Sequence, residues 1–276
     1  MFDIDDIIIF GDSFESDLKR LDEVLGRIAT NGLKVDPQKC HLFQKRFFFL
    51  GHIVSEEGIS TDTEKIETVK SWPSPKNIKE VRSFLGTCSY YRRFIKDFAT
   101  IAKPLHKLTE KNVQYDWTET CENAFQELKN ALTTSPLLGY PDMKKPFILD
   151  TDASGYGLGA VLSQTVNGKE SVIAYYSRSL SKPERQYCVT RRELLAIVSA
   201  IRNFHHYLYG SPFLVRTDHG ALNWLLRFKN PEGQMARWLE VLNTYNFEVQ
   251  HRPGRLHGNA DGLSRRPCYP CGHCNN

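Results

Sequence analysis

Four acidic residues in the second half of the chain have the chemistry of metal ligands. They are Asp152, Glu193, Asp218 and Asp261. Carboxylates brought close together repel one another unless cations lie among them, and such hard oxygen ligands suit Mg²⁺ or Mn²⁺ rather than Zn²⁺. Two such ions about 3.5–4 Å apart can activate a water molecule and stabilise the leaving oxygen when a phosphodiester bond is hydrolysed. The acids therefore suggest a two-metal site for phosphodiester hydrolysis.

Each of these acids also has a purely structural explanation. Glu193 follows Thr190 by three residues and could complete a capping box at the start of a helix. Asp218 and Asp261 could each cap the helix that follows them. Taken singly, the acids leave both explanations open, and only their joint placement favours a metal site.

The elements expected around the acids explain how their side chains could meet. Hydrophobic periodicity predicts strands 147–152, 157–164 and 172–177, a long helix from Thr190, strand 213–218, helices 221–226 and 234–243, strand 247–252 and a helix 259–265. All four acids then lie at element ends, which can converge on one edge of a sheet. We therefore expect an α/β fold with a mixed five-stranded sheet flanked by helices, whose first three strands form an antiparallel meander.

The first half of the chain has a different pattern. We predict a short buried strand 7–10, then a helix that ends at Asn31 and Gly32, and then a hairpin from 47–54 with its turn at Glu57 and Gly58. A helical bundle is expected from Asp62, with a capping box of Asn77 and Glu80. A further helix from about Thr118 and a linker up to Pro146 complete this half. The stretch 61–110 holds ten Lys or Arg and six Asp or Glu, a surplus that equals the +4 of the whole chain. The bundle is therefore expected to have a basic surface, as nucleic-acid-binding proteins do.

The composition narrows the class of protein. With 41% hydrophobic and 25% charged residues the chain has a globular composition, and no apolar run reaches the roughly 20 residues that a membrane helix needs. Met1 is followed by acidic residues rather than by a basic and apolar leader, so we expect an intracellular protein with no membrane partner. Seven cysteines are an odd number for a disulfide scaffold, and reduced thiols are expected at Cys40, Cys88, Cys121 and Cys188.

Five motifs in the second half resemble one known family. They are LDTDAS (149–154), GLGAVLSQ (157–164), RELLAI (192–197), TDH (217–219) and NADGLSR (259–265). In this order they resemble the ribonuclease H domain of gypsy-type LTR retrotransposons, over residues 146–266. The resemblance implies that the four acids bind two Mg²⁺ or Mn²⁺ ions, in an endoribonuclease that cuts the RNA strand of RNA–DNA hybrids. Asp150 is then a structural neighbour. It shares a strand face with Asp152, so the residues alone do not decide which of the two acids binds metal.

The loop before Asp261 holds a further candidate. Related ribonucleases H often have a mobile histidine there that assists product release, and by position the resemblance points to His257. A histidine in an exposed polar loop is also commonly just solvated, so both explanations stay open.

The first half resembles the reverse transcriptase of the same elements. Residues 3–10 resemble the palm signature with its two acids, Asp5 and Asp6, although Asp3 stands where the family has an aromatic residue. Residues 33–40 and 49–55 resemble later palm motifs, and residues 81–86 and 90–94 resemble the thumb. In this family the fingers and a third palm acid precede the signature, so we expect no polymerase activity from this chain alone. Two alternatives remain: a non-catalytic nucleic-acid-binding relic, and a polymerase that becomes active when another chain completes it.

Six residues of the thumb-like segment are candidates for contact with nucleic acid, by neutralising phosphates or by stacking. They are Arg82, Tyr90, Tyr91, Arg92, Arg93 and Lys96. The structural alternative is that the basic residues keep the helices soluble and the tyrosines belong to the core.

The resemblance divides the chain into a palm remnant (1–60), a helical thumb (61–112), a connecting helix and linker (113–145), a ribonuclease H-like domain (146–266) and a linker tail (267–276). The tail holds a cluster of possible zinc ligands, namely Cys268, Cys271, His273 and Cys274. These residues crowd into one turn rather than forming two separated pairs, which disfavours zinc. The expected partners are an RNA–DNA hybrid and other Pol or Gag products. The expected location of the protein is the cytoplasm, a virus-like particle if the element is intact, or the nucleus.

Overall fold

The computed structural model describes residues 7–11, 13–218 and 232–252. The chain divides into two compact units, Met1–Phe47 and Phe48–Asn276, and each is described by itself. Among the helices of the described residues, none combines the length and the hydrophobicity needed to span a bilayer.

The first unit contains one long helix, α1 (Phe14–Thr30), and a short 3₁₀ helix, η1 (Pro37–Lys39). Ser13 caps α1 by accepting a hydrogen bond from the backbone N–H of Ser16. The helix ends at Asn31, and Gly32 follows in the left-handed conformation with φ of 70°, as the sequence predicted. No residue of α1 is buried, and Leu18 and Leu25 of its apolar stripe are 50% and 43% exposed.

The predicted buried strand at residues 7–10 is wrong. These residues form no strand, and Ile7 and Phe10 are 61% and 74% exposed. A strand is stabilised by cross-strand neighbours, and this segment pairs with no other strand among the described residues. The apolar sequence alone therefore does not produce a strand here.

A three-stranded sheet follows, with the order β1-β2-β3. Its strands are β1 (Arg46–Phe49), β2 (His52–Ser55) and β3 (Gly58–Thr61). The predicted turn at Glu57 is present, but a second turn at Leu50 and Gly51 splits the apolar run that we expected to be one strand. Both turn residues have positive φ, 45° and 68°, which is unusual for a leucine.

Two tyrosine hydroxyls from far along the chain contact this second turn. Tyr91 donates a hydrogen bond of 2.7 Å to the carbonyl oxygen of Gly51, and Tyr90 donates to that of Leu50. The turn is therefore held by tertiary contacts that a local reading of the sequence does not contain.

Six helical segments form a bundle that spans residues 63–133, called the helical bundle below. They are α2 (Thr63–Lys70), α3 (Ile78–Tyr90), η2 (Arg92–Phe94), α4 (Phe98–Ile101), α5 (Lys103–Leu108) and α6 (Glu119–Thr133). Asn77 caps α3 by accepting from the backbone N–H of Glu80 at 3.0 Å, as predicted. The centre of the bundle is filled by Phe84, Leu105 and Phe125, which are fully buried.

The segment expected to be a linker before Pro146 is packed against the rest of the second unit. Leu138 is fully buried in the core of the helical bundle. Its backbone exchanges two hydrogen bonds with Ile59 of β3, at 2.8 and 2.9 Å, and the N–H of Gly139 donates to the carbonyl of Val172. These contacts connect the three-stranded sheet, the helical bundle and the sheet that follows.

The C-terminal part of the chain, called the C-terminal sheet below, has five strands in the order β6-β5-β4-β7-β8. They are β4 (Phe147–Ala153), β5 (Gly157–Val166), β6 (Lys169–Ser179), β7 (Phe213–Thr217) and β8 (Phe247–His251). The first three form the predicted antiparallel meander, and β7 lies parallel to both β4 and β8. The predicted mixed five-stranded sheet is therefore confirmed.

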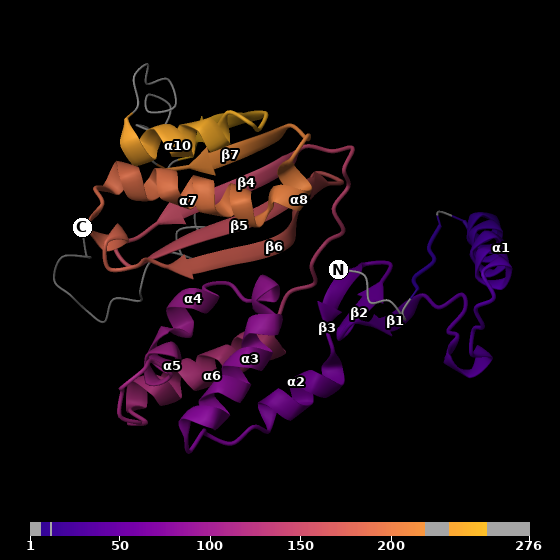
Figure 1. Ribbon diagram of the computed structural model, residues 1–276, viewed down its shortest axis with the longest axis horizontal. Coiled ribbons are helices and arrows are strands. Elements are labelled where there is room, and N and C mark those ends of the chain that lie inside the picture. Colours follow the sequence, from indigo (N-terminus) through magenta and orange to yellow (C-terminus); the bar gives the residue numbers. More distant parts are fainter. Residues whose placement is uncertain (1–6, 12, 219–231, 253–276) are drawn as a thin grey trace. The chain divides into compact units, whose positions relative to one another are not determined.

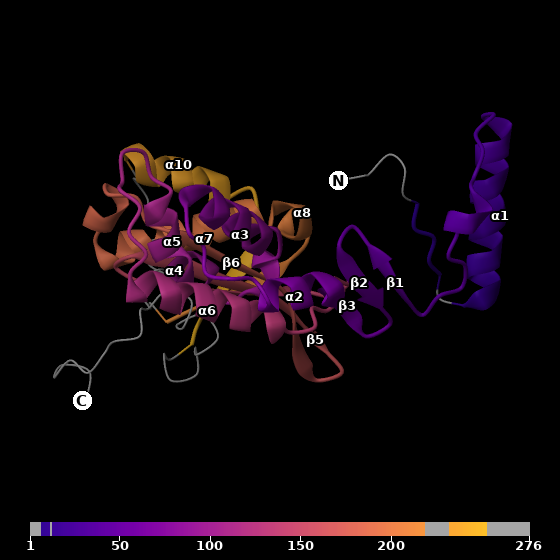
Figure 2. The same cartoon turned by 90° about the horizontal axis from the view of Figure 1, so that it is seen from below.

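Helices cover one face of this sheet, as Figure 1 shows for α7 and α10, and Figure 2 gives a second view of the same layers. The helical elements are η3 (Glu184–Gln186), α7 (Val189–Asn203), α8 (His205–Leu208) and α10 (Gly233–Leu242). Leu149 of β4, Val215 of β7 and Ile197 of α7 are fully buried in the core between the sheet and its helices. This packing fixes the start of α7 relative to β4.

One carboxyl in the helical bundle, that of Asp97, is partly buried and lowers stability when it is ionised, which gives a first prediction. Asp97 precedes α4 with φ of 61°, and its Oδ1 oxygen is buried without a hydrogen-bond partner among the described residues. Burial, and to a smaller extent repulsion by Glu127, raise its pKa to about 7, although Lys96 opposes the shift. The folded chain then keeps this proton up to about pH 7, whereas the unfolded chain releases it near the ordinary value of 3.8. The free energy of unfolding should fall as the pH rises through this window.

Asp97→Asn should therefore raise the melting temperature at pH 8 and leave it nearly unchanged at pH 4. Asparagine tolerates the same positive φ, so the backbone is not strained by the change. Thermal unfolding at both pH values measures the effect, and Asn in place of the exposed Asp116 is the matched control. An equal shift at pH 4 and pH 8 would contradict the role of the buried carboxyl.

Candidate metal centre

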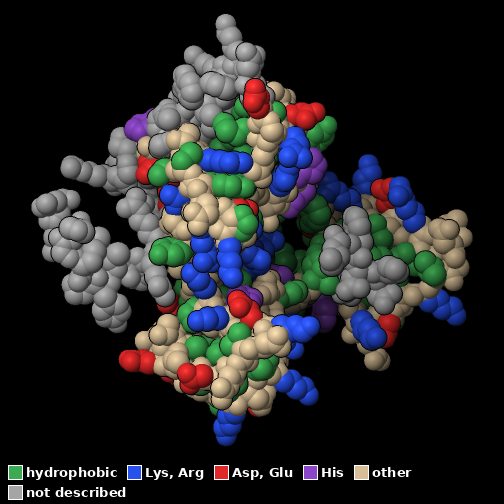
Figure 3. All heavy atoms as spheres, turned by 60° about the vertical axis from the view of Figure 1, so that its left-hand side comes forward, with side chains coloured by type: hydrophobic (Ala, Val, Ile, Leu, Met, Phe, Trp, Pro, Cys, Tyr) green, Lys and Arg blue, Asp and Glu red, His purple; other side chains and the backbone are tan. Residues whose placement is uncertain are grey.

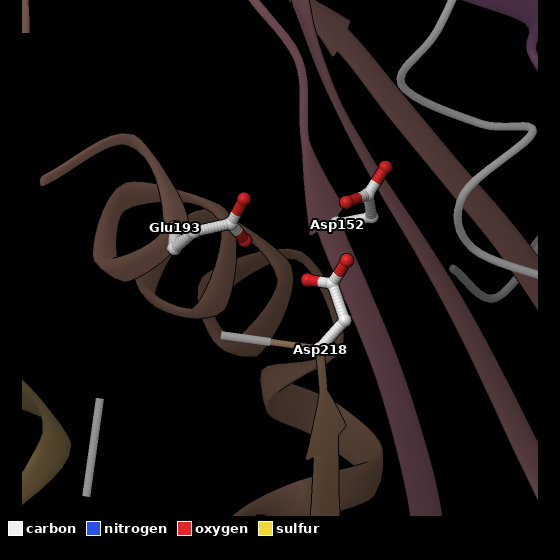
Figure 4. Close-up of side chains that lie close together, drawn as sticks. All are labelled: Asp152, Glu193 and Asp218. Carbon is white, nitrogen blue, oxygen red and sulfur yellow. The ribbon is translucent and has the colours of Figure 1, made fainter. Parts of the chain in front are cut away.

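Three of the four predicted acids lie together. One carboxylate oxygen from each of Asp152, Glu193 and Asp218 lies within 4.8 Å of the others, and Figure 4 shows the three side chains turned toward one another. Asp152 is near the end of β4 and Asp218 directly follows β7. Because β4 and β7 are parallel neighbours, their C-terminal ends meet at the same edge of the sheet. This is the convergence that the sequence predicted.

Glu193 comes to this edge from the helix. The structure does not support the capping-box explanation, because α7 begins at Val189 after Cys188, with no side-chain hydrogen bond at the cap, so Glu193 lies beyond the first helical turn. Its carboxylate instead accepts a hydrogen bond from the backbone N–H of Ala153, the residue after Asp152. The glutamate is therefore tied to the end of β4.

The cluster is electrostatically unfavourable without a cation. Glu193 is 3% exposed, and burial, followed by repulsion from Asp152 and from Asp218, raises its pKa to about 9. The Ala153 N–H and the nearby Arg192 oppose this shift and do not cancel it. In the protein without metal, Glu193 therefore keeps its proton at neutral pH.

The donor set of this cluster fits a hard divalent cation. All three groups offer carboxylate oxygen, and the Oε2 oxygen of Glu193 is buried without a hydrogen-bond partner among the described residues. Asp152 and Glu193 are buried, whereas Asp218 is half-buried, so the site has one side that reaches solvent. Such a site could bind a metal ion and still admit a substrate phosphate.

Several predicted site residues lie outside the described residues. They are Asp5, Asp6, His257, Asp261, Cys268, Cys271, His273 and Cys274. The fourth acid, the candidate histidine, the palm-like acids and the possible zinc ligands therefore stay predictions.

Asp150, the alternative candidate for the metal ligand on β4, has a different environment from Asp152. Arg216 donates two hydrogen bonds to its carboxylate, from Nε at 2.8 Å and from Nη2 at 2.6 Å, and both side chains are buried. Arg216 also binds Glu170, and Arg252 lies 3.6 Å from Asp150. Asp150 is thus held in an ion-pair network, which separates it from the metal cluster even though it lies on the same strand as Asp152.

Sequence reasoning missed Arg216, although its position carries a signal. Arg216 precedes Asp218 by two residues, just as Asp150 precedes Asp152 by two. Asp150 and Arg216 are register partners across β4 and β7, so the two acids that follow them come level with each other. An arginine between the buried residues Val215 and Thr217 of a central strand needs a buried acid as its partner.

The residues predicted to contact nucleic acid have varied surroundings. Tyr91 is 1% exposed, so it follows the structural alternative and packs in the core, whereas Tyr90 is half exposed. Arg82 is exposed and donates to the carbonyl of Thr109 at 3.3 Å, and Lys96 is half-buried.

Arg92 and Arg93 have partners on the C-terminal sheet. Arg92 donates to the carbonyl of Ser177 at 2.7 Å, and Arg93 donates to that of Ile173 at 3.4 Å. Neither contact was expected from the sequence, which placed both arginines on the basic surface of the bundle.

Comparison with known proteins gives consistent results. A family model described as "RNase H-like domain found in reverse transcriptase" matches residues 117–215. The Pol polyprotein of transposon 412 from Drosophila melanogaster is 41% identical over 262 residues, which are 95% of this chain and 21% of that protein. The Pol polyprotein of the transposon gypsy from the same organism is 39% identical over 95% of this chain and 26% of its own length.

A polyprotein of the transposon Tf2-3 from Schizosaccharomyces pombe is 36% identical over 267 residues, covering 95% of this chain and 20% of that protein. The chain thus spans about a fifth to a quarter of the length of these relatives.

The fold also has solved counterparts. The foamy viral protease-reverse transcriptase in complex with an RNA/DNA hybrid has a TM-score of 0.79 at 21% identity, over 97% of this chain and 36% of that one. The same viral protein in complex with double-stranded DNA has a TM-score of 0.73 at 23% identity, over 88% and 52% of the two chains. At this level of identity the likeness shows the fold, and the C-terminal sheet with its helices has the RNase H-like fold.

Proposed function

Since this chain is a homologue of the Pol polyproteins of gypsy-like and Tf2 retrotransposons, we propose that its RNase H-like part cuts the RNA strand of RNA–DNA hybrids. The observation that carries the proposal is the cluster of Asp152, Glu193 and Asp218, whose ligand oxygens lie within 4.8 Å of one another on the edge of the sheet. Asp261 would complete the site as its fourth acid.

The acids would hold two Mg²⁺ or Mn²⁺ ions, because an oxygen-only donor set suits these cations. When bound, such ions would activate water and stabilise the leaving oxygen of the phosphodiester. Glu193 would release its proton on binding the cations, because their charge would offset the burial and the repulsion by Asp152 and Asp218 that together raise its pKa. Asp218, on the solvent side of the cluster, lies where a substrate phosphate would approach.

Binding of nucleic acid is supported by the charge of the molecule. Residues 61–110 carry the surplus of Lys and Arg, and Figure 3 shows these side chain types gathered on one face, at the level where the helical bundle adjoins the C-terminal sheet. A basic surface of this kind attracts phosphates and makes binding depend on salt. The foamy viral protein solved in complex with an RNA/DNA hybrid has the same fold, which supports a hybrid as the substrate of this chain.

Cleavage of a labelled RNA–DNA hybrid by the full chain tests the proposal. We expect the RNA strand to be cut in Mg²⁺ or Mn²⁺, cleavage to stop on chelation with EDTA, and double-stranded DNA of the same sequence to stay intact. Hybrid binding without cleavage in either metal would overturn the proposal and favour the nucleic-acid-binding relic. Cleavage that persists in EDTA would overturn the metal mechanism.

A further inference from the structure

The outer strand β6 raises the question of what covers its free edge. An edge strand presents backbone N–H and carbonyl groups that have no ladder partner on the outer side, and proteins commonly cover such edges. In the order β6-β5-β4-β7-β8, β6 has a strand neighbour on one side only. Figures 1 and 2 show that α4 of the helical bundle lies against this strand.

Hydrogen bonds from the bundle follow the edge of β6. As described above, the guanidinium groups of Arg92 and Arg93 donate to the carbonyls of Ser177 and Ile173. The Ser177 hydroxyl accepts from the backbone N–H of Ala99 at 2.9 Å, and the Ser179 hydroxyl donates to the Ala99 carbonyl at 3.4 Å. Two backbone carbonyls of β6 are therefore bonded by arginines of the bundle, and two hydroxyls of the same strand bond to the backbone of Ala99.

Apolar contacts accompany these hydrogen bonds. Val172 and Tyr175 of β6 pack against the core of the helical bundle, and burial raises the pKa of the Tyr175 hydroxyl. The same two side chains also contact Val161 of β5. The apolar contact thus extends from the bundle through β6 to the next strand of the sheet.

The bundle also reaches the turn that follows the metal cluster. The Lys103 ammonium of α5 lies 4.8 Å from the ring centroid of Tyr156, in the turn between β4 and β5. A methyl group added at Gly157 would lie 3.8 Å from the Thr100 hydroxyl of α4. Since Asp152 lies just before this turn, the bundle contacts the same end of the sheet that holds the acids.

We propose that segment 91–103 of the bundle is a docking surface that closes the β6 edge, and that Arg92 and Arg93 hold it by binding β6 carbonyls rather than phosphates of nucleic acid. Both guanidiniums also lie over rings of the bundle, Arg92 at 5.2 Å from Phe98 and Arg93 at 5.8 Å from Phe94. These rings orient the planar groups toward β6. The two arginines are therefore positioning residues for the sheet.

The test uses the full chain with Arg92→Gln and Arg93→Gln together. The matched control is Lys79→Gln together with Lys107→Gln, which removes two positive charges from exposed side chains elsewhere on the bundle. Without metal or nucleic acid, hydrogen exchange of the β6 peptide 169–179 should become several-fold faster in the arginine variant and stay unchanged in the control. This measurement does not depend on the proposed cleavage activity.

The second measurement is the salt dependence of hybrid binding in EDTA, with a short RNA–DNA hybrid as the probe. A docking role predicts that the log–log slope of the arginine variant equals that of the unsubstituted chain, whereas each lost phosphate contact would flatten it by about 0.7 to 0.9. Unchanged exchange of β6, or a slope flatter than that of the unsubstituted chain, would overturn the proposal. If the double variant does not fold, the single Arg92→Gln and Arg93→Gln chains are measured in the same way.

Discussion

Asp152→Asn should abolish metal-dependent cleavage of the hybrid and leave the fold intact. The change removes one ligand of the acid cluster and one of the two charges that repel Glu193. Loss of groups that merely support a metal ligand costs about 10–100-fold in activity, so loss of a ligand itself should cost more than about 100-fold. Because repulsion is relieved, the melting temperature of the metal-free chain should stay the same or rise slightly.

Asp150→Asn is the control for this prediction, because it makes the same chemical change two residues earlier on β4. Asp150 binds Arg216 rather than the cluster, so its replacement should lower the melting temperature. Cleavage measured well below that temperature should persist. Initial rates and thermal unfolding of both variants decide the assignment: inactivation by Asp150→Asn with a stable fold, or unfolding by Asp152→Asn, would show that the wrong acid was assigned to the metal.

Arg216→Leu should destabilise the second unit by roughly 3 to 5 kcal/mol, because removal of one partner leaves a buried charge uncompensated. The Asp150 side chain is 1% exposed and that of Arg216 is 9% exposed, so water cannot replace the lost contacts. Arg252, 3.6 Å from Asp150, remains and should keep the loss toward the lower end of this range. Urea denaturation measures the free energy of unfolding.

A second ion pair of the same sheet provides the comparison. Arg178 and Glu184 also form a two-bonded pair, but their side chains are 34% and 19% exposed. Arg178→Leu should therefore cost about 1 kcal/mol or less. Equal losses at Arg178 and Arg216 would contradict the argument from burial. Asp150→Leu combined with Arg216→Leu should recover part of the loss, because an apolar pair leaves no charge buried.

The C-terminal sheet could be predicted from the sequence because its elements have strong local patterns. Alternating residues, short turns and a long amphipathic helix placed Asp152, Glu193 and Asp218 at element ends, where the structure has them. Their convergence depends on the parallel pairing of β4 with β7, which the structure shows. The positions of the elements depend on periodicity, which a sequence contains.

The features that were missed depend on tertiary contacts. The turn at Leu50 is held by the hydroxyls of Tyr90 and Tyr91, forty residues away, and Leu50 itself has a conformation that its residue type disfavours. Arg92 and Arg93 looked like surface charges until the β6 edge was in place beside them. Local periodicity says that a side chain is exposed on its own helix, and it does not say which other element that side chain contacts.

The pairing of Asp150 with Arg216 has a consequence for how the two strands align while the chain folds. A slip of β7 against β4 by one residue would turn apolar side chains away from the core, so the core itself prevents it. A slip by two residues keeps every side chain on its proper face, and a core of similar apolar residues resists it weakly. That slip would move Asp218 by about 6.6 Å along its strand, two steps of about 3.3 Å, and would take its carboxylate out of the cluster. It would also separate the buried Asp150 from Arg216 and break the two hydrogen bonds between them. The ion pair thus favours the correct alignment of β7 with β4, because a slip by two residues that the apolar core would tolerate separates the two buried charges.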